Sequence, residues 1–411
     1  MERIIFHIDV NSAYLSWTAA DRLKKGESID LRTIPSIVGG DSESRHGIVL
    51  AKSTPAKKYG IITGEPIAMA LRKCPELVCV PPDFSLYSQE SKKLFALLSD
   101  YSDRIEQFSV DEGFLDYSGM EKLLGPPLET AERIRSRIRE ELGFTVNIGV
   151  SSNKILAKMA GELEKPDKLI TLFPHEMETK LWPLPVEELF MVGRRTAPRL
   201  HRMGIHTIGE LARFPLPLLE KECKSFGRML HAYANGIDDS PVVPNAEAED
   251  IKSIGNSTTT PHDVTDRETA YKILLALSET VSMRLRGHAL CACEIAVTLK
   301  SSDFKVYSHQ RQLINAIDCT NAVYEAAREI FDEVWTQEPL RLLGIRAGKL
   351  CDESCTQLSL LDTDWSKQKK ADAAMDALRL KYGKDTVRRS TLAAEDHAFA
   401  GKLKIHKDVI K

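Results

Sequence analysis

Three acidic side chains interrupt apolar stretches of the sequence. Asp9 closes the first apolar run, and Asp111 and Glu112 break a second one between Val110 and Phe114. Ionised groups among such neighbours are costly unless a counter-charge neutralises them. Carboxylate oxygens suit hard divalent cations, and two ions held by shared carboxylates can activate an attacking oxygen and hold leaving phosphates. The three acids are therefore candidate ligands for two metal ions used in phosphoryl transfer.

The same acids have a plainer interpretation. Acidic residues beside strands are commonly solvated loop ends, and adjacent residues on a regular strand point to opposite faces of the sheet. Spacing alone leaves both interpretations open. The elements around Asp9 and around the Asp111–Glu112 pair must decide whether the acids can meet.

Those elements predict a sheet in which the acids can meet. Apolar runs predict one strand that ends at Asp9 and a hairpin over 105–118, and the intervening patterns add helices at 12–23, 84–101 and 129–142 and a strand at 144–151. The resulting β-α-β-β-α-β order is typical of a ferredoxin-like sheet, here with an insertion after the first helix. In such a sheet the first and third strands lie side by side.

The remaining chain predicts further domains, so the expected fold class is multidomain α+β. Residues 182–235 predict short-looped helices, and the acidic, proline-containing stretch 238–250 predicts an exposed tether. Residues 251–349 alternate helices and strands, which predicts a second α+β domain. A further helix is predicted at 367–382, in a polar and then basic tail.

Composition describes an ordinary globular protein. The 411 residues are 43% hydrophobic and 28% charged, with a net charge of −3, which argues against a uniformly basic nucleic-acid binder but allows a basic face. We expect no membrane segment and no secretion signal. The eight cysteines form no CxxC pair, so reduced thiols of a cytoplasmic protein are preferred over a zinc site at Cys351 and Cys355, which stays open.

Short motifs around the acids add a resemblance. They are DVNSAY at 9–14, SVDEGFLD at 109–116, GVSSNKILAKMA at 149–160, EKPDKL at 164–169, LFMVGRRTAPRLHRMGIHTIGELA at 189–212 and KSIGNSTTTPHDVTD at 252–266. In this order they closely resemble Y-family DNA polymerases, the DNA polymerase IV type in particular, over residues 1–350. The resemblance implies an error-prone, template-directed DNA polymerase that copies damaged DNA, acts in DNA repair and replication, and adds deoxynucleotides to a primer.

The resemblance also implies a domain arrangement. The catalytic palm would comprise 1–16 and 78–170, the fingers 17–77, the thumb 171–237, the linker 238–249, the little finger 250–350 and the tail 351–411. The thumb would be a helix–hairpin–helix domain, and the little finger an α+β domain.

For the catalytic centre, the resemblance implies a role for each acid. Asp9 and Asp111 would bridge two Mg²⁺ ions, for which Mn²⁺ can substitute, while Glu112 would hold the catalytic ion and the carbonyl of Val10 would complete the nucleotide-side site. Tyr14 would be the steric gate that excludes a 2′ hydroxyl. A buried aromatic anchor is the alternative interpretation of Tyr14.

The resemblance places the incoming nucleotide against a second set of residues. Lys165 would act as a point charge on the triphosphate. The fingers depart from the family pattern, because Thr54 and Lys57 stand where a Tyr and an Arg are usual. Thr54 can still donate one hydrogen bond, whereas Lys57 keeps the charge without the bidentate fork of an arginine.

Two groups of basic residues are candidate DNA contacts. In the helix–hairpin–helix segment, backbone N–H groups near a turn would meet a phosphate, although Met191 stands where the family's first Gly is usual. The candidates there are Gly193, Arg194, Arg195 and Arg199. In the third region, basic side chains would line a sheet that grips the duplex, with Arg284, Arg286 and Arg346 as the site residues. Solvated basic surfaces remain the alternative for both groups.

The tail contains QLSLL at 357–361, which resembles the peptide that docks bacterial polymerases on the sliding clamp. Leu358, Leu360 and Leu361 would fill apolar pockets while Gln357 fixes the register. The expected partners are primer–template DNA, a dNTP and the clamp, and the protein is expected to be a cytoplasmic monomer.

Two competing functions are weaker. A catalytically inactive adaptor that binds DNA and the clamp would have no reason to keep all three acids and Lys165. A nucleotide cyclase would share the metal carboxylates, but the helix–hairpin–helix, the third domain and the clamp-like peptide argue for DNA.

Overall fold

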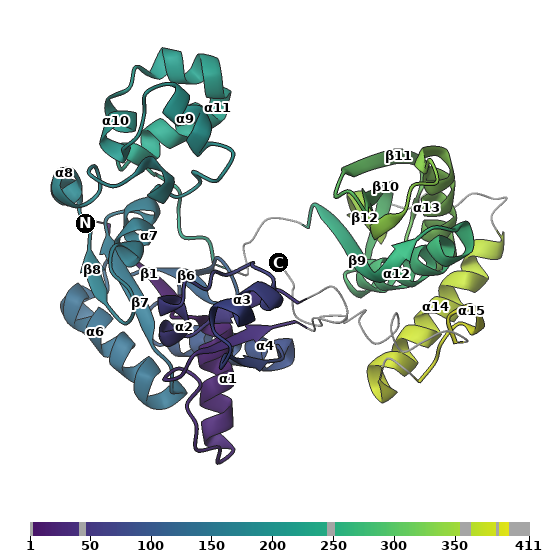
Figure 1. Cartoon of the computed structure of the whole chain (residues 1–411), viewed down its shortest axis with the longest axis horizontal. Helices are drawn as coiled ribbons and strands as arrows, with labels where there is room; N and C mark the ends of the chain where they lie inside the picture. Colours follow the sequence, from purple (N-terminus) through teal and green to yellow (C-terminus); the bar gives the residue numbers. More distant parts are fainter. Residues whose placement is uncertain (1–2, 41–46, 245–250, 354–362, 384–385, 394–411) are drawn as a thin grey trace. The chain divides into compact units, whose positions relative to one another are not determined.

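A computed structural model describes residues 3–40, 47–244, 251–353, 363–383 and 386–393, without the side chains of 363–366 and of residue 393. The described chain divides into two compact units, which comprise residues up to 244 and residues from 251 onward (Figure 1). No helix in these described ranges is long and apolar enough to cross a membrane. Each unit is considered by itself.

The first unit is built on a five-stranded sheet. Its strand order is β5 (Ile105–Gln107), β6 (Glu112–Asp116), β1 (Ile5–Val10), β7 (Val146–Ser151) and β8 (Leu169–Thr171). β1 is antiparallel to both of its neighbours. The strands β1, β5, β6 and β7 have the order of a ferredoxin-like sheet, so the predicted fold class is confirmed.

Side-chain alternation along β1 separates an apolar face from a polar one. Phe6, Ile8 and Val10 pack into the large core that α1 (Ala13–Lys24), α4 (Phe84–Leu98) and α6 (Pro127–Arg137) also form. A π-helical turn, Ile138–Leu142, extends α6. His7 and Asp9 alternate with these residues and therefore point to the opposite face.

Helix α7 (Lys154–Leu163) covers that opposite face at very short range. A Cβ at Gly149 of β7 would lie 2.0 Å from the carbonyl oxygen of Ala157, so only glycine allows this approach. A Cβ at Gly161 would lie 3.2 Å from Nδ1 of His7. α7 therefore runs directly over the strand that carries Asp9 (Figure 1).

A small domain is inserted between α1 and α4. Its three strands are ordered β3 (Val49–Lys52), β2 (Ser36–Gly39) and β4 (Val78–Val80), with helices α2 (Thr54–Lys58) and α3 (Ile67–Lys73). The predicted insertion is thus present, but the expected start at residue 17 falls inside α1. Trp17 and Ala19 of that helix belong to the core of the larger sheet.

Helices dominate the end of the first unit. They are α8 (Met177–Lys180), α9 (Ala197–Arg202), α10 (Ile208–Arg213) and α11 (Leu216–Ala234), with short 3₁₀ turns at Pro174–Glu176 and Val186–Glu188; α5 (Glu121–Leu124) lies earlier in the chain. Thr207 caps α10 by accepting from the N–H of Glu210, whose carboxylate accepts in return from the N–H of Thr207. Short loops between these helices agree with the prediction.

The expected exposed tether is wrong for its first part. Asp238 accepts a hydrogen bond from the N–H of Ile155, and Val242 is buried beside Ile5. The N–H of Val243 donates to Glu106. Residues 238–244 therefore dock on the first unit, because one acid and one apolar side chain find partners there that their local sequence does not reveal.

The second unit is an antiparallel sheet with two helices on one face. The strand order is β11 (Val306–Ile317), β10 (Leu290–Ser301), β12 (Leu340–Asp352) and β9 (Ser253–Val264), and the helices are α12 (Arg267–Gly287) and α13 (Thr320–Val334). Its β-α-β-β-α-β element order equals that of the first sheet. The strand order differs, since its last strand lies between its first and its second.

Helix α14 (Thr363–Tyr382) and the short α15 (Ser390–Ala393) lie against this unit (Figure 1). Asp372 is 2% exposed and accepts from the N–H of Thr320 and from the guanidinium groups of Arg286 and Arg389. Glu279 of α12 pairs with Arg379 and Arg389. The predicted tail helix is therefore a structural part of the second unit.

We expect Asp372→Ala to destabilise the second unit by about 3 kcal/mol, because it removes a buried carboxylate that Arg286, Arg389 and the N–H of Thr320 share and leaves only Asp376 and Glu279 to pair with the two arginines. Native-state hydrogen exchange of the full chain measures this as faster exchange in α12 and α14. Asp303→Ala, at an exposed acid of the same unit, is the control and should change nothing. Equal protection in parent and Asp372→Ala would show that the ion-pair cluster contributes no stability.

Candidate active site

The sheet brings the backbones of the predicted metal ligands together. In the antiparallel ladder Asp9 lies opposite Glu112, and the N–H of Val10 donates to the carbonyl oxygen of Asp111 over 3.0 Å. Val10 is the last residue of β1, and Glu112 is the first of β6. Residues more than a hundred positions apart therefore share one end of two neighbouring strands.

Glu112 is held by two cationic or polar partners. Its Oε2 lies 2.5 Å from Nζ of Lys158 and 3.0 Å from Nε2 of His7. Burial opposes ionisation, but the hydrogen bonds from His7 and Lys158 outweigh it and lower the pKa of Glu112 to about 2. Burial also lowers the pKa of His7, whose Nδ1 has no hydrogen-bond partner. The geometry fits an ionised Glu112 beside a neutral imidazole.

Asp9 faces a different lysine. Its Oδ2 accepts from Nζ of Lys165 over 2.6 Å, and Lys165 also contacts Glu162 over 2.8 Å. Burial raises the pKa of Asp9, and the charge of Lys165 opposes that rise. Asp111 accepts a hydrogen bond from Oγ of Ser109 over 2.6 Å. Each acid thus has its own partner.

The acids do not form a ready metal cage. Nowhere in the described ranges do three or more His, Cys, Asp or Glu side chains group closely enough to hold a metal ion. In the described chain Asp9 pairs with Lys165 and Glu112 pairs with Lys158, so the assignment of the three acids as metal ligands stays a prediction. The donor set still fits divalent cations, since three carboxylates lie at the adjoining ends of β1 and β6, and two of them, Asp9 and Glu112, face ammonium groups that a metal ion could replace.

A cleft of about 240 Å³ lies beside Asp9 and unites residues that were predicted separately. Thr54 and Lys57 enter it from α2, and Lys165 enters it from the loop after α7. Its remaining lining residues are Asn11, Ser12, Leu15, Ser16, Arg32, Ser53, Thr145 and Pro166. The four predicted residues therefore share one cavity between the large sheet and the inserted domain.

Tyr14 packs against aromatic neighbours near this cleft. Its ring stacks on Tyr87 with centroids 4.4 Å apart and meets Phe84 edge-on at 6.0 Å. The side chain is half-buried, and burial followed by the charge of Asp111 raises the pKa of its hydroxyl. These contacts fit the interpretation of Tyr14 as an aromatic anchor. The part of its ring that stays exposed leaves the gate role as a prediction.

The predicted thumb contacts lie in and beside one turn. Gly193, Arg194 and Arg195 are exposed before α9, and Arg199 on that helix lies 3.7 Å from Glu222. Met191 has a φ of 75°, a conformation that favours glycine. The turn therefore keeps its backbone shape despite the unusual residue.

Two of the three predicted sheet contacts in the second unit, Arg284 and Arg286, lie on α12 and not on the sheet, and Arg286 is wrong as a surface contact too. Arg286 does not line the sheet, because it belongs to α12 and pairs with Asp372 and Asp376 of α14 at only 11% side-chain exposure. Arg284 of the same helix donates to the carbonyl of Gly255. Arg346 does project from β12, where it contacts Glu294 and Gln310.

Two further predictions concern residues that the structure does not describe, in whole or in part. Gln357, Leu358, Leu360 and Leu361 lie outside the described residues. Cys355 does as well, while Sγ of Cys351 lies 3.8 Å from Sγ of Cys293 on the neighbouring strand. No metal-ligand group accompanies these two thiols in the described chain.

Sequence reasoning missed Lys158, His7 and Arg32. Signals existed for the first two, since His7 lies two residues before Asp9 on the same face of β1 and Lys158 interrupts the apolar pattern of α7. Arg32 lies in an irregular turn before β2, and nothing in its neighbourhood marks it as part of a cleft.

Known proteins resemble this chain along almost its whole length. The profile of the impB/mucB/samB family matches residues 8–162, its C-terminal domain matches 251–360, and a thumb-domain profile described as DNA polymerase-iota matches 187–238. DNA polymerase IV of Clostridium acetobutylicum is 47% identical over 96% of this chain and 100% of its own length. DNA polymerase IV of Acetivibrio thermocellus is 39% identical over 95% of this chain and 98% of its own length.

A solved structure supports the same architecture. A Y-family DNA polymerase chimera superposes with a TM-score of 0.72 over 85% of this chain and 99% of its own length, at 24% sequence identity. A ferredoxin-like sheet with acids at the ends of adjoining strands and a cationic cleft is typical of palm-type nucleotidyl-transfer enzymes. Within that class, the chain belongs to the Y family of DNA polymerases. Its relatives in that family include bacterial DNA polymerase IV proteins.

The low pKa of Glu112 predicts a pH-dependent contribution to stability. A group whose pKa falls on folding stabilises the folded state above its unfolded pKa, and this contribution is lost as the pH falls toward the folded pKa. The fall from 4.5 to about 2 corresponds to about 3 kcal/mol. We expect the parent to exceed Glu112→Gln in stability most above pH 5, and this difference to shrink between pH 4.5 and 2.

Urea denaturation of both proteins between pH 7 and 3 measures this difference. Glu121→Gln, at a different acid of the first unit, provides the background titration. A parent-to-variant difference that stays constant over this range would contradict the depressed pKa.

Proposed function

We propose that this chain is an error-prone, DNA-dependent DNA polymerase that copies damaged templates by two-metal nucleotidyl transfer. The observation that supports this function best is the cleft that Asp9 shares with Thr54, Lys57 and Lys165. A carboxylate and several phosphate-binding groups in one cavity suit a nucleoside triphosphate whose α-phosphate lies near the metal ligands. Membership in the Y family supplies the enzyme class, DNA-directed DNA polymerase.

Asp9, Asp111 and Glu112 would hold two Mg²⁺ ions, with the carbonyl of Val10 as a further oxygen donor. Bound ions lower the barrier by activating the primer's 3′ oxygen and neutralising charge on the leaving pyrophosphate. The protein keeps Glu112 ionised through His7 and Lys158 at the pH of the cell. Positioning and charge neutralisation account for most of the rate increase in such reactions.

Lysines prepare the site for highly charged substrates. Lys165 supplies positive charge at the cleft, and because its side chain lines the cavity it could exchange Asp9 for a triphosphate as partner. Lys57 enters the same cleft from α2 and can add a second point charge. Thr54 can add one neutral hydrogen bond.

The sugar would be selected by Tyr14. The stack on Tyr87 fixes the ring, and a fixed ring beneath the sugar leaves no room for a 2′ hydroxyl. Selection by rigid exclusion needs such support, since a mobile side chain would move aside.

Duplex DNA would be held by the remaining parts of the chain. We propose that the thumb comprises 171–237 and the little finger 250–350, as expected, and that the palm keeps all of α1, so that it comprises 1–24 and 78–170 and the fingers comprise 25–77. Gly193, Arg194, Arg195, Arg199, Arg284 and Arg346 are the proposed backbone contacts, and Arg286 is left out because α14 occupies it. QLSLL is proposed to bind the sliding clamp, and a cytoplasmic monomer is the proposed state.

A catalytically inactive adaptor is the second candidate. It would bind DNA and the clamp without the cleft, and it has no use for a carboxylate beside Lys57 and Lys165. Primer extension with Mg²⁺ on damaged and undamaged templates separates the two functions. Extension past the lesion supports the polymerase, and binding without extension on either template supports the adaptor.

We expect Asp111→Ala to lower primer extension by about a thousandfold or more, because a metal ligand is lost while the DNA-binding surfaces remain. Gel assays of extension and equilibrium DNA binding measure the two effects separately. Asp103→Ala, at an exposed acid before β5, is the matched control. Normal extension by Asp111→Ala would refute the metal assignment.

We expect Tyr14→Ala to incorporate ribonucleotides at least tenfold more efficiently relative to deoxynucleotides than the parent does. Tyr14→Phe keeps the ring and should keep the discrimination. Competition assays with paired dNTP and rNTP measure the ratio. If Tyr14→Ala and the parent discriminate equally while both remain folded, another residue is the gate.

A further inference from the structure

Arg32 lines the same cleft as Lys57 and Lys165, although nothing in the sequence marked it. Its turn lies between α1 and β2, far along the chain from either lysine. We propose that Arg32 is a binding residue for the triphosphate of the incoming nucleotide and supplies the guanidinium that position 57 lacks. This inference rests on the proposed polymerase function and identifies which residue carries part of its substrate recognition.

The guanidinium of Arg32 is held in a fixed orientation. Its Nε and Nη2 donate to the carboxylate of Asp30 over 2.9 Å, and its Nη1 donates to the carbonyl of Gly143 over 2.7 Å. A guanidinium carries five N–H donors. These bonds use three of them and leave one N–H on each terminal nitrogen, and because Arg32 lines the cleft we expect these groups to meet a ligand there.

The other cations of the cleft, Lys57 and Lys165, do not have a rigid pair of N–H groups. Lysine is a point charge on a flexible stem, whereas the planar fork of arginine matches two phosphate oxygens at once. Lys165 is also engaged by Asp9 and Glu162. Among the residues that line the cleft, only Arg32 carries a guanidinium.

The departure of the fingers from the family pattern gives this arrangement a reason. Lys57 stands where an arginine fork is usual, so the chain would otherwise bind a triphosphate with point charges alone. Arg32 approaches the cleft from the turn before β2 and Lys57 approaches it from α2. Arg32 would thereby replace, from a different segment of the same unit, the guanidinium that is absent at Lys57.

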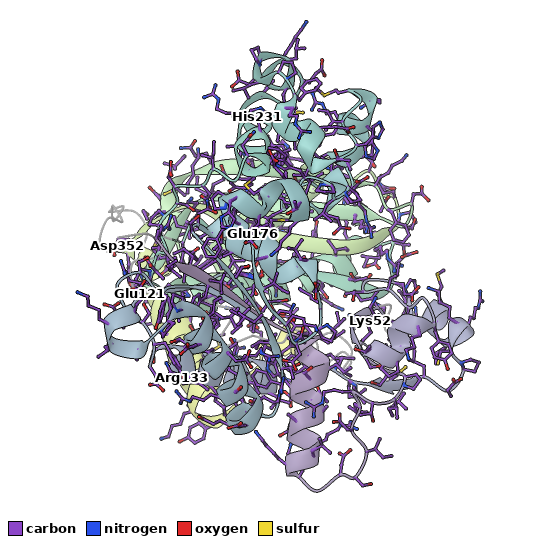
Figure 2. All side chains as sticks on the ribbon, turned by 90° about the vertical axis from the view of Figure 1, so that its left-hand side faces the viewer. Lys52, Glu121, Arg133, Glu176, His231 and Asp352 are labelled. Atoms are coloured by element: carbon purple, nitrogen blue, oxygen red, sulfur yellow. The ribbon has the colours of Figure 1, made fainter. Side chains whose placement is uncertain are left out.

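Lys52 is the obvious rival by sequence, because it lies two residues before Thr54. Its Nζ donates to the carbonyl of Ile61 over 2.6 Å, and it is not among the residues that line the cleft. Figure 2 labels Lys52 beside the helices of the inserted domain. Burial, followed by the charge of Lys57, lowers its pKa. Lys52 therefore supports the inserted domain from within and leaves the cleft to Arg32.

The test compares Arg32→Gln with the control Arg22→Gln. Arg22 lies in the same unit, pairs with Glu27 outside the cleft, and has nearly the same side-chain exposure as Arg32, 32% against 31%. Loss of a charged hydrogen-bond donor should weaken binding about tenfold or more. We expect Arg32→Gln to raise KM for every dNTP by that factor and Arg22→Gln to leave it unchanged. A fall in kcat alone would assign Arg32 a structural role and overturn the proposal.

Inorganic tripolyphosphate isolates the phosphate contact. Calorimetric titration of the full chain with this probe needs no catalysis and contains neither sugar nor base. We expect its Kd to rise about tenfold in Arg32→Gln and to rise in Arg32→Lys as well, because lysine keeps the charge but loses the fork. Equal affinity in parent and Arg32→Gln overturns the proposal even if primer extension succeeds, whereas Arg32-dependent binding without any extension counts against the polymerase function alone.

A double-mutant cycle tests the replacement directly. Lys57→Arg restores the usual fork, so it should recover part of the dNTP affinity lost in Arg32→Gln and gain little in the parent. An identical effect of Lys57→Arg in both backgrounds would show that the two residues do not share the phosphate group. Thermal unfolding of each variant confirms that the turn at Arg32 stays folded.

Discussion

Negative charge at the end of an apolar sheet is the constraint on which the first unit depends. β1 buries Phe6 and Ile8 on one face, and the same strand carries Asp9 on the other. Carboxylates in such surroundings need cations, and without bound metal the chain provides Lys158 and Lys165. Two of the three acids therefore already have a cationic partner in the folded chain, so under the proposed function a metal ion or a substrate would exchange partners with Lys158 and Lys165.

Under the proposed function, this exchange of the lysine partners depends on how α7 packs. The helix lies close to β7 because Gly149 and Gly161 have no side chains, and that approach carries Lys158 to Glu112. Lys165 follows the same helix and reaches Asp9. α7 and the loop that follows it thus bring one lysine to each of the two strands, and under the proposed function a change in the approach of α7 would alter the metal site and the triphosphate site together.

The two sheets show how far periodicity can predict topology. Both units read β-α-β-β-α-β, and the first has the ferredoxin-like strand order while the second has its last strand between its first and second. Helix and strand periodicity depend on local burial, so the elements at 84–98 and 320–334 were predictable. Strand order depends on which faces pack best over long loops, and no local pattern reports it. The docking of Val242 and the pairing of Arg286 with α14 escaped prediction for the same reason.

The sequence by itself determined the chemically active residues. Residue type and local order identify the three acids, the lysine after α7 and the tyrosine on the first helix, and they predict the helix or strand beside which each residue lies. Tertiary structure alone decided the partners. It turned Asp9 and Glu112 toward lysines, placed Thr54 and Lys57 in one cleft with Lys165, and added Arg32 to that cleft. Contacts of this kind join segments far apart in sequence, and their free energy arises only when the folded chain excludes water between them.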